Sequence, residues 1–276
     1  MTAKAYYQPQ SLDEATGLLA EHGLSLLVMA GGTLAMPLIN EGISLPEKVM
    51  GLRRAGLNYL GKSNGSLAIG ATTTLTQMLS QQEIPLLQEA ARNVGGWAIR
   101  NMGTVGGNLF APPPAGDFAV ALLALDAQVK LVSKSGARII PLSDFYTGFM
   151  ATALMPGELV AEILVPEPRG ITAYLKYGRR HANTPAVVTV AVHIQFEGAR
   201  VNDARLALNA VGSHPFRARK AEQAMTGSRL DPKTLESVAS IAMEESEPFT
   251  DAVASEWYRR KMVGIFVRRA LQQIAV

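Results

Sequence analysis

Small and hydrogen-bonding residues concentrate in the stretch 100–108, which reads Arg-Asn-Met-Gly-Thr-Val-Gly-Gly-Asn. Gly106 and Gly107 have no Cβ, so backbone N–H groups there can lie close to a ligand, and Thr104 and Asn108 add short polar side chains. Several such donors around a tight turn suit an anion. The stretch therefore predicts an anion-binding loop.

An aspartate follows this loop at the start of an apolar segment. The three prolines at 112–114 cannot enter a helix or a central strand, so they form a rigid rim. Asp117 then stands directly ahead of the apolar residues 118–125, where a helix N-cap belongs. We expect Asp117 to cap this helix, to contact the ligand, or to do both.

A second glycine-containing turn lies nearer the N-terminus. The apolar run 24–29 is typical of a buried parallel strand, Ala-Gly-Gly-Thr follows at 30–33, and residues 34–40 favour a short helix. Glycine at the carboxyl end of a buried strand, with a helix N-terminus next, is a place for a phosphate group. Alone this turn is a weak signal, and it gains weight from the loop at 103–108.

Two catalytic motifs overlap at residues 56–65. Residues 56–63 fit the P-loop pattern G-x-x-x-x-G-K-[ST], and residues 61–65 fit the nucleophile elbow G-x-S-x-G. Both motifs need a helix directly afterwards, whereas the Asn-Gly pair at 64–65 favours a two-residue hairpin. We therefore predict a surface β-hairpin over 59–70, with neither a phosphate site nor a serine nucleophile.

The composition excludes several mechanisms. The 276 residues include no cysteine, so the chain has no disulfide, thiol nucleophile or iron–sulfur cluster of its own. The four histidines show no metal-binding spacing, and no G-x-G-x-x-G pattern or Ser-His-carboxylate set stands out. A chain so poor in catalytic groups fits a cofactor that supplies the chemistry.

Charge and hydropathy bear on the kinds of partner and on the location to expect. The formal charge is +3, with basic residues in short scattered pairs, so we expect no nucleic-acid partner. No stretch reaches the roughly 18 uninterrupted apolar residues of a membrane span, and the N-terminus lacks a hydrophobic signal core. A cytoplasmic location is the default expectation.

Two prolines and a glycine at 166–170 mark the best domain boundary. Beyond it, strand-like runs at 172–177, 186–196 and 204–211 precede helical segments near 216–226, 232–245 and 251–274. This layout predicts a small sheet covered by helices.

Residues 99–127 closely resemble the second flavin-binding loop of the FAD subunit of molybdenum hydroxylases, the family of xanthine dehydrogenases and aerobic carbon monoxide dehydrogenases. The matching elements are Arg-Asn-x-Gly-Thr-x-Gly-Gly-Asn, an Asp nine residues later, and an Ala-Leu-rich helix ending in Leu-Asp-Ala. The turn at 30–33 is similar to the family's first FAD loop, normally Ala-Gly-Gly-Thr-Asp or Ala-Gly-Gly-His-Ser. Leu34 departs from that pattern and removes one polar side chain, while the backbone amides remain.

The resemblance implies an α+β fold. A two-part FAD-binding domain of the vanillyl-alcohol-oxidase-like type would occupy residues 1–166, with subdomains of about 1–55 and 56–166. A small C-terminal flavoprotein domain with a three-stranded antiparallel sheet and three helices would occupy residues 171–276.

The resemblance also implies which residues bind FAD. The two glycine loops would hold the pyrophosphate from opposite sides, and Asp117 would reach a sugar or ribityl hydroxyl. Val160 and Lys176 would border the isoalloxazine ring, where a cation would raise the reduction potential of the flavin. No residue is expected to be catalytic or to bind a metal, and the implied FAD-binding residues are Met29, Ala30, Gly31, Gly32, Thr33, Leu34, Ala35, Thr104, Gly106, Gly107, Asn108, Asp117, Val160 and Lys176.

The function implied is that of an electron-transferring flavoprotein subunit of an oxidoreductase. [2Fe-2S] clusters on an iron–sulfur partner would deliver electrons to the flavin, and NAD, oxygen or another acceptor would receive them. A third subunit would carry the molybdenum cofactor, within a dimer of heterotrimers. Leu34 keeps open the alternative of a flavin-less scaffold subunit. A self-sufficient flavin oxidase is a third hypothesis, although no histidine or tyrosine stands where a substrate base is needed.

Overall fold

The N-terminal part of the chain forms a small parallel sheet. The structure is a computed structural model that describes residues 3–275. The strands pair in the order β1-β3-β2, α1 connects β1 to β2, and α2 lies between β2 and β3. The strand predicted over 24–29 is two residues shorter, because Gly23–Ser25 form a 3-10 turn. These elements are β1 (Ala5–Tyr7), α1 (Leu12–His22), β2 (Leu26–Met29), α2 (Ala35–Asn40) and β3 (Lys48–Gly51).

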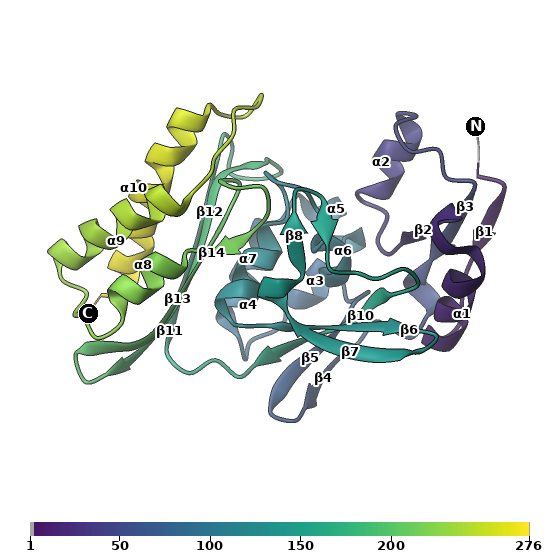
Figure 1. The fold of residues 1–276 in the computed structure, drawn as a ribbon, viewed down its shortest axis with the longest axis horizontal. Coiled ribbons are helices and arrows are strands. Elements are labelled where there is room, and N and C mark those ends of the chain that lie inside the picture. Colours follow the sequence, from purple (N-terminus) through teal and green to yellow (C-terminus); the bar gives the residue numbers. More distant parts are fainter. Residues whose placement is uncertain (1–2, 276) are drawn as a thin grey trace.

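An antiparallel sheet lies in the middle of the molecule (Figure 1). Its order is β4 (Leu60–Ser63), β5 (Ser66–Gly70), β10 (Leu159–Pro166), β6 (Gln128–Ser133) and β7 (Gly136–Pro141). The hairpin predicted over 59–70 is confirmed, since β4 and β5 pair through a turn in which Asn64 and Gly65 have φ angles of 49° and 77°. Positive φ at both positions is what a type I′ turn requires. Strand β5 therefore stands where a P-loop or a nucleophile elbow needs a helix.

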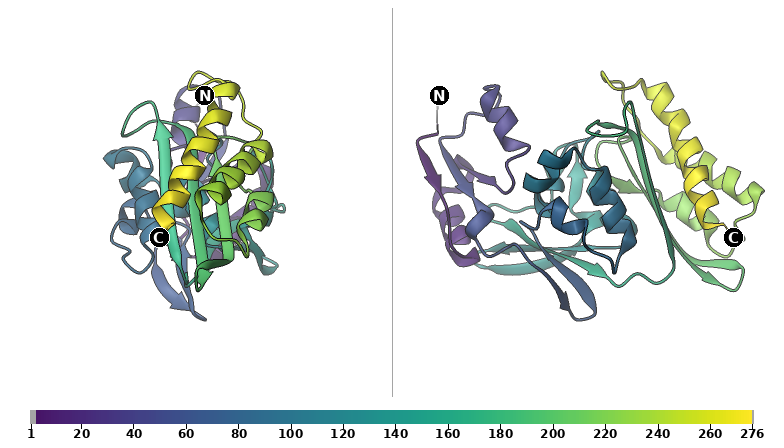
Figure 2. Two further views of the ribbon diagram at one scale, coloured as in Figure 1. Left: turned by 90° about the vertical axis from the view of Figure 1, so that its left-hand side faces the viewer. Right: turned by 180° about the vertical axis from the view of Figure 1, so that it is seen from behind.

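Short helices pack over one face of the middle sheet (Figure 2). They include the glycine loop at 103–108, which begins directly after α5 and continues as α6, and which lies against Gly31 at the end of the N-terminal sheet. The elements of this layer are α3 (Leu75–Met78), α4 (Pro85–Asn93), α5 (Trp97–Met102), α6 (Val105–Asn108) and α7 (Asp117–Ala124). A small hairpin of β8 (Tyr146–Gly148) and β9 (Ala151–Thr152) follows β7, and further 3-10 turns span Leu52–Arg54 and Leu142–Asp144.

Helix α7 is the central element of the packing. Every one of its residues is buried, because it packs against α4 and α6 on one side and against β12 and β13 of the next sheet on the other. A helix buried all round can be apolar all round, and the run from Phe118 to Leu125 meets that condition. Asp117 is the one charged residue in the helix.

The C-terminal sheet is antiparallel and, within residues 3–275, has four strands rather than the predicted three. The added strand β14 is only two residues long and pairs with β13, ahead of a helix that begins at Arg219 instead of near residue 216. Two residues after Pro215 are too few to show an alternating pattern, so no sequence signal marks this strand. The elements are β11 (Ile171–Gly178), β12 (Ala186–Glu197), β13 (Arg200–Asn209), β14 (Phe216–Arg217), α8 (Arg219–Met225), α9 (Pro232–Glu245) and α10 (Glu256–Ile274).

The two faces of this sheet serve different cores. Val188, Val190 and Val192 of β12 pack in the core formed with α8, α9 and α10. The alternate residue Ala191, with Ala207 of β13, packs instead in the core that contains α7. Small side chains on that face let the buried helix lie close to the sheet.

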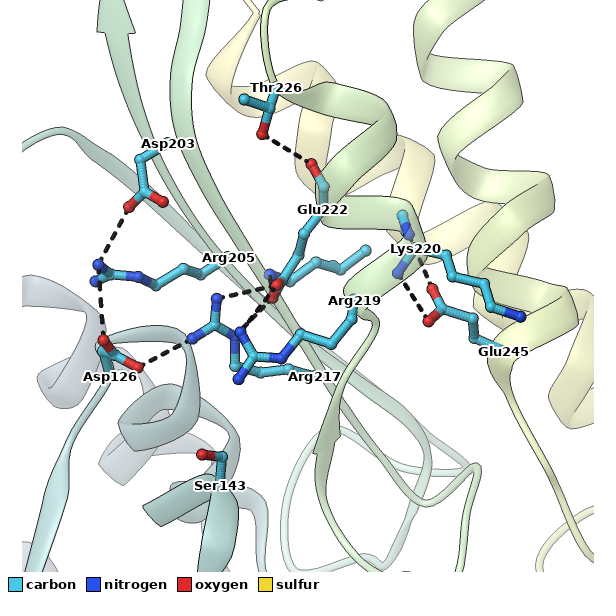
Figure 3. A network of polar contacts seen from close by, with 12 residues as sticks. Asp126, Ser143, Asp203, Arg205, Arg217, Arg219, Lys220, Glu222, Thr226 and Glu245 are labelled. Carbon is cyan, nitrogen blue, oxygen red and sulfur yellow. Dashed lines mark hydrogen bonds and ion pairs between the residues drawn. The ribbon is translucent and has the colours of Figure 1, made fainter. Parts of the chain in front are cut away.

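A polar network also links the C-terminal sheet to the end of α7 (Figure 3). Asp126, two residues after the helix, accepts a hydrogen bond from Arg217 at 3.0 Å and lies 3.8 Å from Arg205. Arg217 is held in place by a two-fold contact with Glu222, at 2.7 and 2.9 Å. Both ends of α7 are thus fixed to the C-terminal sheet by charged contacts, since Asp117 at its first position pairs with Lys176 of β11.

Two features relevant to function, a membrane-spanning helix and a metal-binding cluster, are absent from the residues that the structure describes. Among residues 3–275 the structure has no helix with the length and apolar character that a lipid bilayer requires. The same residues include no group of three or more His, Cys, Asp and Glu side chains placed to hold a metal ion.

Arg259 in α10 is the largest fully buried side chain of the C-terminal core, with 0% exposure. Its Nη1 donates to the backbone carbonyls of Ala186, Val187 and Ala210 at 2.9–3.0 Å, and its Nη2 donates to Asp251 at 2.8 Å. The guanidinium therefore joins α10 to the ends of β12 and β13.

Replacing this arginine tests that role. Arg259→Met removes the donor for three buried carbonyls and should lower the free energy of unfolding by about 3–5 kcal/mol. Arg268→Met on the same helix breaks a surface ion pair with Glu236 and should change it by no more than about 1 kcal/mol. Urea denaturation of both variants measures the difference, and equal losses would contradict the assignment.

Candidate functional site

Two adjoining cavities lie where the glycine loops meet. The first, of about 230 Å³, extends along the N-terminal sheet to Leu154 and Val160. The second, of about 240 Å³, extends toward the C-terminal sheet and includes Asp117 and Lys176. Both cavities are lined by Thr33, Leu34, Thr104 and Gly107, so they meet at one waist. All fourteen residues implied by the resemblance line one cavity or the other.

The first glycine loop offers its backbone to this waist. Within residues 3–275, none of the N–H groups from Gly31 to Ala35 donates a hydrogen bond to a protein atom. Buried or half-buried amides are normally paired, so a row of free ones indicates a place for an acceptor. The remaining sequence-predicted residues Met29 and Ala30 line the first cavity directly before these amides.

Gly31 lets the two loops touch. A Cβ at this position would overlap the backbone carbonyl of Met102, and it would lie 3.1 Å from the Cα of Gly103. Only glycine allows two backbones to approach so closely. The residue therefore lets the end of the N-terminal sheet contact the start of the second loop, beside the first cavity.

The second glycine loop differs from our expectation. Residues 105–108 form the single turn α6, whose amides are all used within the protein. Val105 and Gly106 donate to the carbonyls of Thr73 and Ala71 at 2.9 Å, and Gly107 donates to the Thr104 hydroxyl at 3.1 Å. The glycines are needed for packing instead, because a Cβ on Gly106 would lie 2.8 Å from Ala71. Thr104 and Gly107 still line the waist.

Of the two roles expected for Asp117, capping its own helix is wrong. The N-cap of α7 is Gly116, with a φ of 84°, and Asp117 is the first helical residue. The cap comes from the preceding loop, since the Asn108 Oδ1 accepts the Phe118 N–H at 3.1 Å. The distant amide replaces the local carboxylate because the Asp117 side chain points elsewhere.

The Asp117 carboxylate forms a buried ion pair across the domain junction. Its Oδ2 lies 2.7 Å from the Lys176 Nζ, and its Oδ1 accepts the Thr189 hydroxyl at 2.7 Å. The Lys176 ammonium also donates to the backbone carbonyl of Asn93 at 2.9 Å. The two paired side chains are only 6% and 7% exposed. Burial raises the pKa of Asp117, and the Lys176 and Thr189 contacts act in the opposite direction.

Val160 and Lys176 do not share a cavity. Val160, at an irregularity of strand β10, lines the first cavity, whereas Lys176 lines the second. The geometry therefore gives no support of its own to the expectation that both border one ring. Sequence spacing could not show this, because the two residues come from different sheets.

Several functional neighbours were missed from the sequence. Thr189 and the Asn93 carbonyl hold the buried pair, while Phe110 and the segment 183–185 line the cavities. One signal was present for Thr189, because it interrupts the apolar run of β12 and a buried hydroxyl needs a partner. No comparable signal marks a backbone carbonyl.

Both carboxylate oxygens of Asp117 already accept hydrogen bonds, and the backbone groups that the first loop leaves free are N–H donors, so the arrangement can bind and orient a cofactor. Free amides at the waist suit a phosphate-containing linker. A cavity on each side leaves room for the two ends of a dinucleotide. The residues present therefore fit FAD.

The matches with known proteins cover nearly the whole chain. Residues 2–168 match the family described as the FAD binding domain in molybdopterin dehydrogenase, and residues 173–274 match the CO dehydrogenase flavoprotein C-terminal domain. The glyceraldehyde dehydrogenase medium chain of Sulfolobus acidocaldarius is 33% identical over 98% of both chains. The carbon monoxide dehydrogenase medium chain of Afipia carboxidovorans is 30% identical, over 97% of this chain and 95% of the relative.

Solved structures agree with these matches. A chain of the reconstituted CO dehydrogenase from Oligotropha carboxidovorans superimposes with a TM-score of 0.94 and 30% identity, covering 99% of this chain and 98% of that one. A chain of quinoline 2-oxidoreductase from Pseudomonas putida 86 gives a TM-score of 0.92 and 28% identity, covering 99% and 97%. The predicted family and the two-domain mixed α/β architecture are thereby confirmed. The chain belongs to the FAD-binding medium subunits of the molybdenum hydroxylase family and is an oxidoreductase component.

Proposed function

We propose that this subunit holds one FAD across the two cavities, with the pyrophosphate at the waist. The observation that carries the proposal is the row of free backbone amides from Gly31 to Ala35. Such amides bind phosphate oxygens without a side chain. Thr104 and Gly107 close the waist from the other side, and Asn108 acts by fixing the start of α7.

We further propose a direction for the cofactor. The isoalloxazine ring occupies the second cavity, where Lys176 uses two of its three N–H donors on protein atoms and keeps one for the occupant. The adenosine occupies the first cavity, beside Leu154 and Val160. Asp117 then serves the site through its neighbours, since both of its carboxylate oxygens already accept hydrogen bonds.

The proposed activity is electron transfer through this flavin. Bound FAD supplies the capacity to accept and release electrons, while the protein binds and orients it. Because the chain has no cysteine, iron–sulfur clusters that deliver electrons reside on a partner subunit. The molybdenum cofactor resides on a third subunit, and NAD or oxygen receives the electrons. A dimer of heterotrimers, a cytoplasmic location, the vanillyl-alcohol-oxidase-like class and the domain limits 1–166 and 171–276 stay predictions.

The visible absorption spectrum of the purified complex tests the proposal. We expect flavin bands that bleach when the substrate of the molybdenum subunit is added and return when an acceptor follows. The scaffold alternative expects no flavin on this subunit after denaturing extraction. A flavin that stays oxidised while the partner clusters become reduced would contradict the electron-transfer role.

Replacing Gly31 with alanine tests whether FAD binding needs the close contact between the two glycine loops. Gly31→Ala should weaken FAD binding by about 10-fold to 100-fold, because relieving an overlap with a backbone carbonyl costs about 1–3 kcal/mol. Gly17→Ala is the matched control, since a Cβ there meets no atom within 4 Å. FAD titration followed by fluorescence compares the two variants, and equal affinities would place the pyrophosphate elsewhere.

Replacing Leu34 distinguishes the flavoprotein hypothesis from the flavin-less scaffold alternative. Its side chain is 38% exposed and makes no capping hydrogen bond at the start of α2, while its amide is free. Leu34→Ser should therefore change the FAD dissociation constant by less than about threefold and stabilise the protein by about 0.5–1 kcal/mol through a new cap. A tight FAD complex formed only by the serine variant would favour the scaffold alternative.

A further inference from the structure

The Asp117–Lys176 pair supports an inference beyond cofactor binding. The lysine comes from β11 and the aspartate from α7, so the pair joins the two domains directly beneath the second cavity. Few water molecules can screen it, because both side chains are more than nine-tenths buried. The charge on Lys176 is therefore largely compensated by its partner.

The contacts around the pair fix which group faces the cavity. The Asp117 carboxylate accepts hydrogen bonds from Lys176 and from the Thr189 hydroxyl. The backbone carbonyl of Asp117 accepts a further hydrogen bond from the Tyr174 hydroxyl at 3.2 Å. Lys176 is held from two sides by Asp117 and by the Asn93 carbonyl, which orients its remaining N–H. The carboxylate thus positions the ammonium.

We propose that Asp117 is a positioning residue that aims Lys176 at the flavin ring and compensates its charge, which sets the reduction potential of the bound flavin below the value that a free lysine would give. The inference rests on the proposed function, because it needs the ring in the second cavity. A cation beside the ring favours the reduced form by Coulomb attraction. A neighbouring carboxylate lessens that attraction, so the ion pair gives an intermediate potential.

The test compares charge-changing variants of the FAD-loaded complex. Asp117→Asn keeps the shape of the side chain and leaves Lys176 uncompensated, so reduction of the flavin should become about tenfold more favourable, about 30 mV for a two-electron couple. Lys176→Gln leaves Asp117 uncompensated and should shift the potential by a similar amount in the opposite direction. The double variant should lie close to the original protein.

A charge-matched control comes from the same helix. Asp126→Asn removes the same charge beyond the other end of α7, roughly 13 Å farther along the chain axis, where the side chain is half exposed and pairs with Arg217. The flavin potential should not change in this variant. Spectroelectrochemical titration gives the potentials, and FAD content after denaturation gives the occupancy for each variant.

Three results would overturn the inference. The first is an Asp117→Asn variant that holds FAD at an unchanged potential. The second is a folded Asp117→Asn variant that loses FAD while Lys176→Gln keeps it, since Asp117 would then be a direct ligand. If Asp117→Asn does not accumulate, Lys176→Gln decides alone, and an unchanged potential in it is the third. An original protein without FAD would instead refute the proposed function itself, and the inference with it.

Discussion

The buried ion pair between Asp117 and Lys176 is the contact on which the rest of the structure depends. Two charges leave water only when each finds close partners, and removing one partner of such a pair commonly costs about 3–5 kcal/mol. The partners here come from distant parts of the chain: Thr189 from β12, and the carbonyl of Asn93 from the end of α4. The C-terminal sheet must therefore lie against α7 in one register.

The ion pair is also connected to the waist between the two cavities. The carboxylate of Asp117 is directed away from the end of its helix, so Asn108 supplies the cap for α7. Asn108 is the last residue of α6, a turn whose other end is capped by the Thr104 hydroxyl. Thr104 lines the waist opposite the free amides of the first loop. A short series of hydrogen bonds thus connects the domain junction to the place proposed for the pyrophosphate.

Much of the fold and the general position of the site could be predicted from the sequence. The Asn64-Gly65 turn, the helix over 232–245 and the long strand at β12 each carry a strong local pattern, and the structure contains all three. The motifs predicted residues that line the two cavities, because glycine, threonine and aspartate at fixed spacing are typical of a ligand-binding loop. Local pattern, however, describes only which residue types are present.

What failed was the assignment of partners to polar groups. The amides of Val105 and Gly106 in the second glycine loop looked free, yet the carbonyls of Thr73 and Ala71, from a segment before α3, accept them. The cap of α7 and the separation of Val160 from Lys176 were missed for the same reason, since each depends on contacts between segments far apart in sequence. Two-residue β14 is too short to show any pattern of its own.

The contact of Gly31 with the Met102 carbonyl also has a genetic consequence. Any nucleotide substitution that changes the amino acid encoded by a glycine codon adds at least one carbon atom to the side chain, and this position has no space for one. Gly17 and Gly61, by contrast, border open space. A larger side chain at Gly17 or Gly61 therefore meets no steric barrier. At Gly31 every amino-acid change that one nucleotide substitution can produce requires the two backbones to move apart.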